Sequence, residues 1–148
     1  PRAIKGHGVT FATTAMGADH TAGMTIREGL DSHDKKGQLE VSLKMQKLAI
    51  VYDSLGSCLF THVAIKTKMN LLAEMLTNLY GEKWTLEDLL KISEETLIKE
   101  RKYNRSRGLV DSKDKLPTIF TTEKLGSRGL VFDISKEETD SIFDELKV

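Results

Sequence analysis

Apolar side chains recur at helical spacing through the middle of the chain. The first stripe predicts a helix from about residue 39 to 54, because positions three or four apart share one helix face. Its members are Val41, Met45, Leu48, Tyr52 and Leu55. A second stripe covers residues 71–79 and a third begins at Leu89. We therefore expect a helical body over residues 36–108.

Residues at the ends of these stripes are typical helix caps. Asn70 precedes the second stripe as an N-cap, and Gly81 follows it where a left-handed residue often ends a helix. Thr85 and Asp88 have the spacing of a capping box, with Trp84 placed to pack against Leu89, and Gly108 can stop the helix that they begin. The segment after Cys58, residues 59–65, permits either a short helix or a strand because it contains β-branched residues.

The two ends of the chain are less regular. Residues 1–35 contain glycines too closely spaced for one long helix, which predicts loops around short helices. Residues 109–148 are expected to be irregular, with 130–132 as a short strand, until Ser135 and Glu138 cap a terminal helix. The predicted fold is mostly α in a single domain, residues 1–148.

Composition excludes some partners. The chain has 22 basic and 22 acidic residues, so no net field attracts nucleic acid or an anionic membrane. Acidic residues also interleave with the basic stretch 99–107, which favours a solvated face. No apolar run reaches the roughly 20 residues that span a bilayer, and the start lacks a signal-peptide pattern. We expect a cytoplasmic protein that binds neither nucleic acid nor membrane.

Three side chains are candidates for chemistry. Cys58 is the sole cysteine, so it makes no internal disulfide, and a metal cluster here needs ligands from elsewhere. Asp53 lies five residues before it, and His20 lies in a Gly-rich loop, where an imidazole is suited to proton transfer. The alternatives are that Cys58 is a small buried hydrophobe, that Asp53 caps a turn and that His20 is solvated.

The remaining histidines and the methionines have simpler interpretations. His62 lies four residues after Cys58, but no second cysteine or histidine lies nearby, so a structural or surface role is expected. His7 and His33 are expected to be solvated. The five methionines are expected to fill the core.

Three passages, in order, resemble those of the tungsten-containing aldehyde ferredoxin oxidoreductases. The first runs from Pro1-Arg2 through Gly6-His7-Gly8 and Ala12-Thr13 to Gly17-Ala18-Asp19-His20. The second, Asp53-Ser54-Leu55-Gly56-Ser57-Cys58, is similar to D-x-x-G-L-C, with Ser57 in place of leucine, and Leu59 follows it. The third comprises Tyr103-Asn104-Arg105-Ser106-Arg107-Gly108 and Asp114-Lys115-Leu116-Pro117. Together they extend over residues 1–117.

The resemblance implies roles for the candidate residues. His20 would lie beside a metal and position or deprotonate the water that attacks an aldehyde carbonyl. Asp53 would accept hydrogen bonds from one ring of a tungsten-bis-pterin cofactor, and Cys58 would complete a 4Fe-4S cluster, with Leu59 in the same cofactor-binding segment. We expect His20, Asp53 and Cys58 to face one concave surface.

The family's C-x-x-C-x-x-x-C run, its N-terminal β-rich domain and the carboxylate that acts with the histidine are missing from these 148 residues. The resemblance therefore implies the C-terminal domain of a larger parent, with Pro1 as a cut or processing point. The parent would oxidise an aldehyde, with ferredoxin as electron acceptor. Residues 1–148 alone are expected to hold no cofactor and to be inactive. The alternative is a noncatalytic helical scaffold module that retains the family fold. The particular aldehyde, the choice of tungsten or molybdenum and the oligomeric state stay open.

Overall fold

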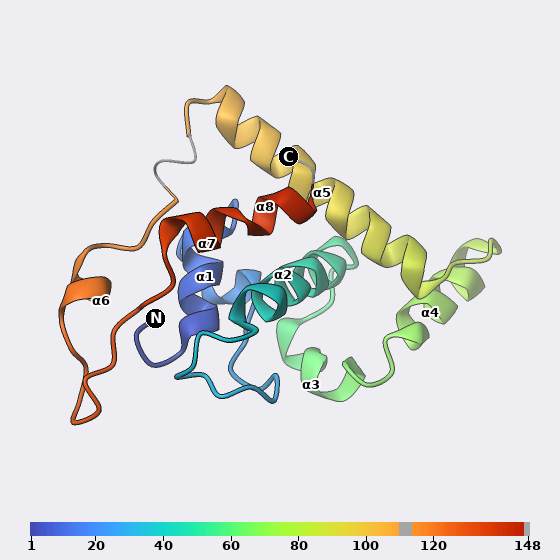
Figure 1. Cartoon of the computed structure of the whole chain (residues 1–148). Coiled ribbons are helices and arrows are strands. Elements are labelled where there is room, and N and C mark those ends of the chain that lie inside the picture. Colours follow the sequence, from blue (N-terminus) through green and yellow to red (C-terminus); the bar gives the residue numbers. More distant parts are fainter. Residues whose placement is uncertain (110–113, 147–148) are drawn as a thin grey trace.

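The computed structural model describes residues 1–109 and 114–146 and is mostly helical, as predicted (Figure 1). Part of the segment expected to be irregular, residues 110–113, lies outside the described residues. Two of the helices, η1 and η2, are single 3-10 turns. The helices in chain order are α1 (Lys5–Thr13), η1 (His20–Ala22), α2 (Gln38–Ser54), η2 (Leu59–Thr61), α3 (His62–Ile65), α4 (Asn70–Tyr80), α5 (Leu86–Ser106), α6 (Ile119–Thr122), α7 (Lys136–Asp140) and α8 (Ile142–Glu145).

The central helix is α2, against which α1 and α5 pack (Figure 1). Leu43, which lies outside the predicted apolar stripe of α2, faces one buried cluster, and the stripe faces another. The first cluster joins the two ends of the chain and contains Val9, Leu43, Leu97, Phe132, Ile134, Ile142 and Leu146. The second joins α2 to α4 and α5 and contains Met45, Leu48, Val51, Tyr52, Met69, Leu72, Ala73 and Leu89.

Small and polar residues bring α1 close to α2. Thr10 Oγ1 and Ser42 Oγ lie 2.8 Å apart, and Gln46 Nε2 donates to Thr13 Oγ1 at 2.9 Å. All four side chains are buried, and each finds a partner, as buried polar groups require. Gly8 of α1 also lies close to the C-terminal segment. A Cβ on Gly8 would lie 2.4 Å from the ring of Phe132, so only glycine permits α1 to approach Phe132 this closely.

Most of the predicted caps are confirmed. Thr85 and Asp88 form a reciprocal capping box, with Thr85 N donating to Asp88 Oδ2 at 2.8 Å and Asp88 N donating to Thr85 Oγ1 at 3.2 Å. Trp84 packs on the cluster that contains Leu89. Gly81 ends α4 with a φ of 73°. The prediction for Asn70 is wrong, because this residue is the first of α4 and Met69, already helical in conformation, precedes it.

The C-terminal part differs from the expected strand. Within the described residues, 130–132 forms no strand, and Leu130 makes only an isolated antiparallel bridge to Leu125. Phe132 instead donates its backbone N–H to Phe120 in α6 at 2.7 Å. The Ser135–Glu138 capping box is confirmed, but the terminal helix is divided at Ser141 into α7 and α8. Residues 59–65 are helical.

Two of the simpler interpretations also need correction. His7 is half-buried and stacks on Phe11 with ring centroids 5.8 Å apart, so it is not a solvated side chain. Met45 and Met69 fill the core as expected, but Met16 and Met75 are 59% and 65% exposed. None of the described helices is long and apolar enough to cross a membrane.

Candidate functional site

The loop between α1 and α2 presents His20 at the surface. Gly17 adopts a positive φ of 81°, which turns the chain, and Asp19 then caps η1. Asp19 Oδ1 accepts hydrogen bonds from Thr21 N and Thr21 Oγ1, both at 2.7 Å, and these bonds lower the pKa of Asp19. The His20 side chain is 62% exposed, with Nδ1 3.9 Å from Asp19 Oδ1. The imidazole is therefore open to a ligand that approaches from outside the chain.

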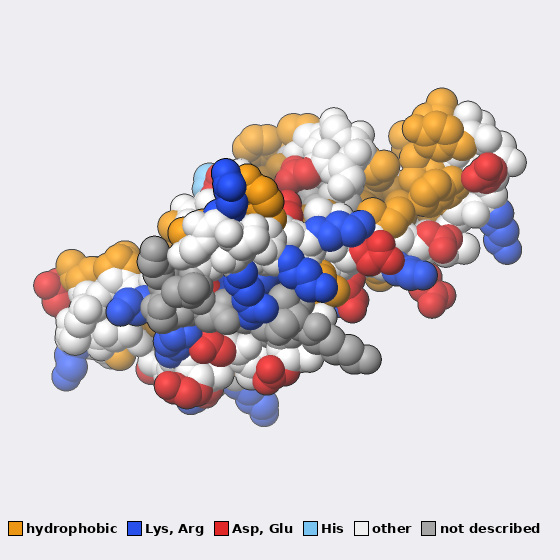
Figure 2. Space-filling view, turned by 90° about the horizontal axis from the view of Figure 1, so that it is seen from above, with side chains coloured by type: hydrophobic (Ala, Val, Ile, Leu, Met, Phe, Trp, Pro, Cys, Tyr) orange, Lys and Arg blue, Asp and Glu red, His pale blue; other side chains and the backbone are white. Residues whose placement is uncertain are grey.

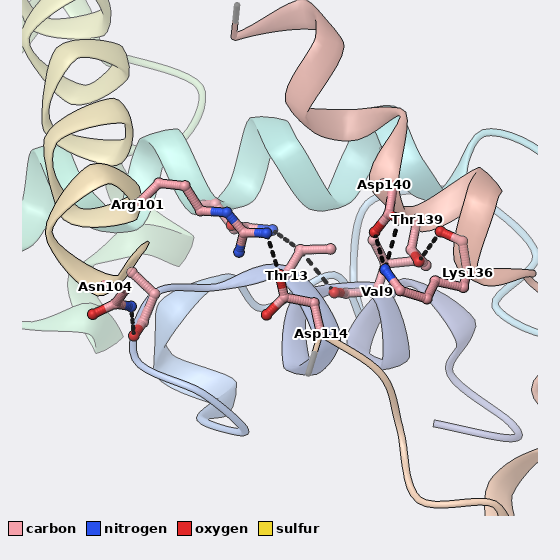
Figure 3. Close-up of polar contacts among 10 residues, drawn as sticks. Val9, Thr13, Arg101, Asn104, Asp114, Lys136, Thr139 and Asp140 are labelled. Atoms are coloured by element: carbon pink, nitrogen blue, oxygen red, sulfur yellow. Dashed lines mark hydrogen bonds and ion pairs between the residues drawn. The ribbon is translucent and has the colours of Figure 1, made fainter. Parts of the chain in front are cut away.

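Residues of the third sequence passage hold this region in place. Asn104 Nδ2, on α5, donates to the carbonyl of Ala15 at 3.0 Å, between α1 and the His20 loop (Figure 3). Arg101, one turn earlier on α5, is buried and forms an ion pair with Asp114 (Figure 3). Asn104 thus holds the backbone at Ala15, and Asp114 holds its segment against α5 through Arg101. Sequence reasoning missed Arg101, whose position one helical turn before Asn104 was the available signal.

The Asp53–Cys58 segment is the C-terminal cap of α2. Gly56 has a positive φ of 63°, Ser57 N donates to Tyr52 O at 2.9 Å and Gly56 N donates to Asp53 O at 3.1 Å. This pattern is the Schellman motif, which explains the glycine of the sequence passage. Ser57 needs only its backbone N–H for the motif, although its side chain lacks the apolar contact that often accompanies it. The cap fixes the backbone that carries Asp53 and Cys58.

Both candidate side chains of this cap are exposed. The Cys58 thiol is free and at the surface, so the interpretation of a buried hydrophobe is wrong. The Asp53 carboxylate accepts no hydrogen bond from the described residues, so it does not cap a turn with its side chain. A carboxylate in the last turn of a helix is also opposed by the helix dipole. Within the described part of the chain, neither side chain is buried.

Two cavities lie near these residues. Asp53 and Ala22, the last residue of η1, both line a cavity of about 90 Å³. Glu100 lines it too, and burial, together with the charge of Asp53, raises the pKa of Glu100. Leu59 lines a separate apolar cavity of about 390 Å³ with Tyr52 and others. The first cavity brings the η1 turn next to Asp53, but Cys58 lines neither, so a common surface for all three candidates stays a prediction.

His62 has the environment of a structural histidine. Its Nε2 is buried without a hydrogen-bond partner among the described residues, and its ring meets the ring of Tyr52 edge to face at 5.8 Å. Burial lowers the pKa of His62, which favours a neutral imidazole. Within residues 1–109 and 114–146, no group of three histidine, cysteine, aspartate or glutamate side chains is placed to hold a metal ion.

Comparison with known proteins identifies the family. A family model described as aldehyde ferredoxin oxidoreductase, domains 2 and 3, matches residues 1–146. The tungsten-containing aldehyde ferredoxin oxidoreductases of Pyrococcus furiosus and Thermococcus kodakarensis are each 31% identical over 134 residues, and that of Pyrococcus horikoshii is 30% identical. Each match covers 84% of this chain and 22% of the relative. The chain therefore belongs to the aldehyde ferredoxin oxidoreductase family and spans about a fifth of the length of these relatives.

Proposed function

We propose that this chain is the C-terminal part of a tungstopterin and iron–sulfur enzyme that oxidises aldehydes to carboxylic acids. Water supplies the added oxygen, and the two electrons released pass singly to ferredoxin while two protons leave to solvent. The observation that carries the proposal is the α2 cap, where Asp53 and Cys58 are both exposed and held on fixed backbone. The family membership of residues 1–146 supports it.

The chemistry of the cap fits the two groups. A carboxylate that accepts no bond from its own chain is able to accept charge-assisted bonds from the amino edge of a pterin, which makes Asp53 the proposed pterin contact, beside Leu59. An exposed cysteine is accessible as a thiolate ligand, the usual ligand of iron–sulfur clusters. Cys58 is one ligand of four, so the other three would come from the parent outside residues 1–148. When bound, the tungstopterin supplies the two-electron oxidation.

His20 is the proposed base. Its imidazole is exposed, and the cap of η1 fixes the backbone on which it stands. It would hold the attacking water and accept its proton, as a histidine in hydrogen-bond reach of a reacting group does. Ala22 of the η1 turn and Asp53 line one cavity, and this arrangement is compatible with a role for His20 beside the pterin.

The experiment compares two variants of the full-length parent. Cys58→Ala should lower the iron content and abolish the paramagnetic signal of the reduced cluster, because a thiolate ligand is lost. Asp53→Ala removes charge-assisted hydrogen bonds worth roughly 1.5–3 kcal/mol each, so tungsten retention should fall while iron remains. Iron and tungsten are measured by mass spectrometry, and the cluster by electron paramagnetic resonance.

A third variant controls for damage to the cap. Ser57→Ala keeps the backbone bonds of the Schellman motif and should change neither metal, since only its N–H is used. A full and reducible cluster in Cys58→Ala would rule out the ligand role. That outcome, with tungsten also unchanged in Asp53→Ala, would leave the noncatalytic scaffold as the function of this chain.

A further inference from the structure

Helix α4 carries large apolar side chains on two faces. Leu72 and Ala73 point into the buried cluster between α2, α4 and α5. Leu71, Met75 and Leu79 are 45%, 65% and 71% exposed. These three positions are each four residues apart, so they form one continuous stripe along the outer face of the helix. We call this stripe the α4 stripe.

Leu76 and Tyr80, the residues that follow Met75 and Leu79 of the α4 stripe, line a groove that reaches the end of α2. It is a cavity of about 450 Å³ between α2, α4 and the start of α5. Its walls include Leu55, Leu76, Tyr80, Trp84 and Ile92. Tyr80 is 64% exposed and Ile92 40%, so part of this apolar wall faces solvent. Figure 2 shows hydrophobic side chains gathered at the right-hand end of the molecule, where α4 and the start of α5 lie.

The groove also adjoins the candidate site. Ser54 and Leu55 line it, and both belong to the cap that carries Asp53 and Cys58. Whatever polypeptide reaches the cap to supply the other ligands therefore also reaches the mouth of the groove. Clustered exposed apolar side chains mark surfaces that another protein segment covers.

We propose that the part of the parent protein outside residues 1–148 packs on the α4 stripe and its groove. This inference rests on the proposed function, which makes the chain one piece of a longer enzyme. The matched relatives support the choice of occupant, because residues 1–148 correspond to only 22% of their length. The remaining polypeptide is large enough to bury the whole stripe.

The chemistry of the surface favours a permanent neighbour over ferredoxin. Permanent interfaces are apolar and resemble a divided core, whereas electron-transfer encounters are small and depend on charge for steering. The α4 stripe contains three apolar side chains, and the chain has no net charge to steer an acidic or basic partner. The stripe thus fits an intramolecular contact of the folded parent.

Met75 is a natural probe of this contact, because methionine oxidation depends on exposure. The rate of sulfoxide formation at Met75 under hydrogen peroxide is measured by peptide mass spectrometry in residues 1–148 and in the full-length parent. In the short chain Met75 should react about as fast as Met16, which is similarly exposed. In the parent its oxidation rate should be at most about one tenth of the rate in the short chain. Met45, which is 3% exposed, is the buried control in both proteins.

A variant pair tests whether the stripe itself makes the contact. Leu79→Glu places a charge on the stripe, should leave the melting temperature of residues 1–148 unchanged because the side chain is exposed, and should restore fast Met75 oxidation in the parent. Lys99→Glu, at an exposed position of α5, should leave Met75 protected. Equal Met75 rates in the short chain and the parent would overturn the inference.

Two other outcomes separate this inference from its alternatives. Protection of Met75 in residues 1–148 that rises with protein concentration, with a doubled mass by light scattering, would assign the stripe to a second copy instead. Protection in a parent that contains no tungsten or iron would keep the docking surface and refute the proposed function. An active parent in which Met75 reacts as fast as in the short chain would support the proposed function and refute the docking surface.

Discussion

Gly8→Ala tests the close approach of α1 to the C-terminal part of the chain. A Cβ at this position would lie 2.4 Å from Phe132 Cε2 and 2.6 Å from Cδ2, where ordinary contact begins near 3.4 Å. The ring would have to move by about 1 Å, and Phe132 is itself 5% exposed within the cluster that contains Val9 and Leu43. The substitution therefore forces a packed core to rearrange.

Two effects of opposite sign determine how much Gly8→Ala changes the free energy of unfolding. Overpacking a core costs about 1–3 kcal/mol, and a displacement of this size belongs to the upper half of that range. Alanine in place of glycine inside a helix contributes about 1 kcal/mol in the other direction. We expect Gly8→Ala to lower the free energy of unfolding by about 1–2 kcal/mol, or the melting temperature by about 2–4 °C for each kcal/mol. Urea unfolding followed by the helical circular dichroism signal measures it.

A double-mutant cycle identifies the cause. Phe132→Leu shortens the side chain that meets the new Cβ, so in this background Gly8→Ala should become neutral or stabilising, since only the helix preference remains. A Gly8→Ala protein more stable than the wild type would refute the reasoning. An undiminished cost in the Phe132→Leu background would show that the ring is not the obstacle.

Two further predictions concern the cap of α5 and the half-buried histidines His7 and His62. Thr85→Ala removes one half of the capping box and should lower the free energy of unfolding by about 1 kcal/mol, so an unchanged urea midpoint would contradict it. Burial lowers the pKa of His7 and of His62 in the folded chain, so the unfolded chain binds protons more readily. The contribution of these histidines to the free energy of unfolding should be complete above their ordinary pKa of 6.5 and should fall as the pH decreases below it. His62→Phe should weaken this pH dependence, and an identical pH profile of stability in that variant would contradict the assignment.

Features that depend on neighbouring residues were predictable from the sequence. The capping boxes of Thr85 and Ser135 and the left-handed Gly81 are local hydrogen-bond patterns, and each is confirmed. Asn70 was misassigned because a distant contact decides where α4 begins. Met69 is buried with its sulfur 3.3 Å from the hydroxyl of Tyr52, and this packing holds it in helical conformation, where an extended N-cap is excluded.

Features that join distant parts of the chain were not predictable. No sequence pattern pairs Arg101 with Asp114 or Phe132 with Gly8, because these contacts depend on the tertiary fold. At the candidate site, the cap that precedes Cys58 is a local pattern, since a glycine with positive φ lies directly after the C-cap of α2. The cavity shared by Ala22 and Asp53 was not, since it forms only when η1 packs on α2.

The packing of α1 on the C-terminal segment also sets an order of events during synthesis. Lys5 pairs with Asp133, 128 residues further along the chain, and Phe132 beside it closes over Gly8. At about 5–20 residues per second, a ribosome takes roughly 6–25 s to make that intervening stretch. During this interval α2, α4 and α5 are made and can begin to assemble, while the face of α1 that Phe132 will cover stays open to solvent and to chaperones. Among the helices of residues 1–148, α1 is thus one of the last to have its packing completed.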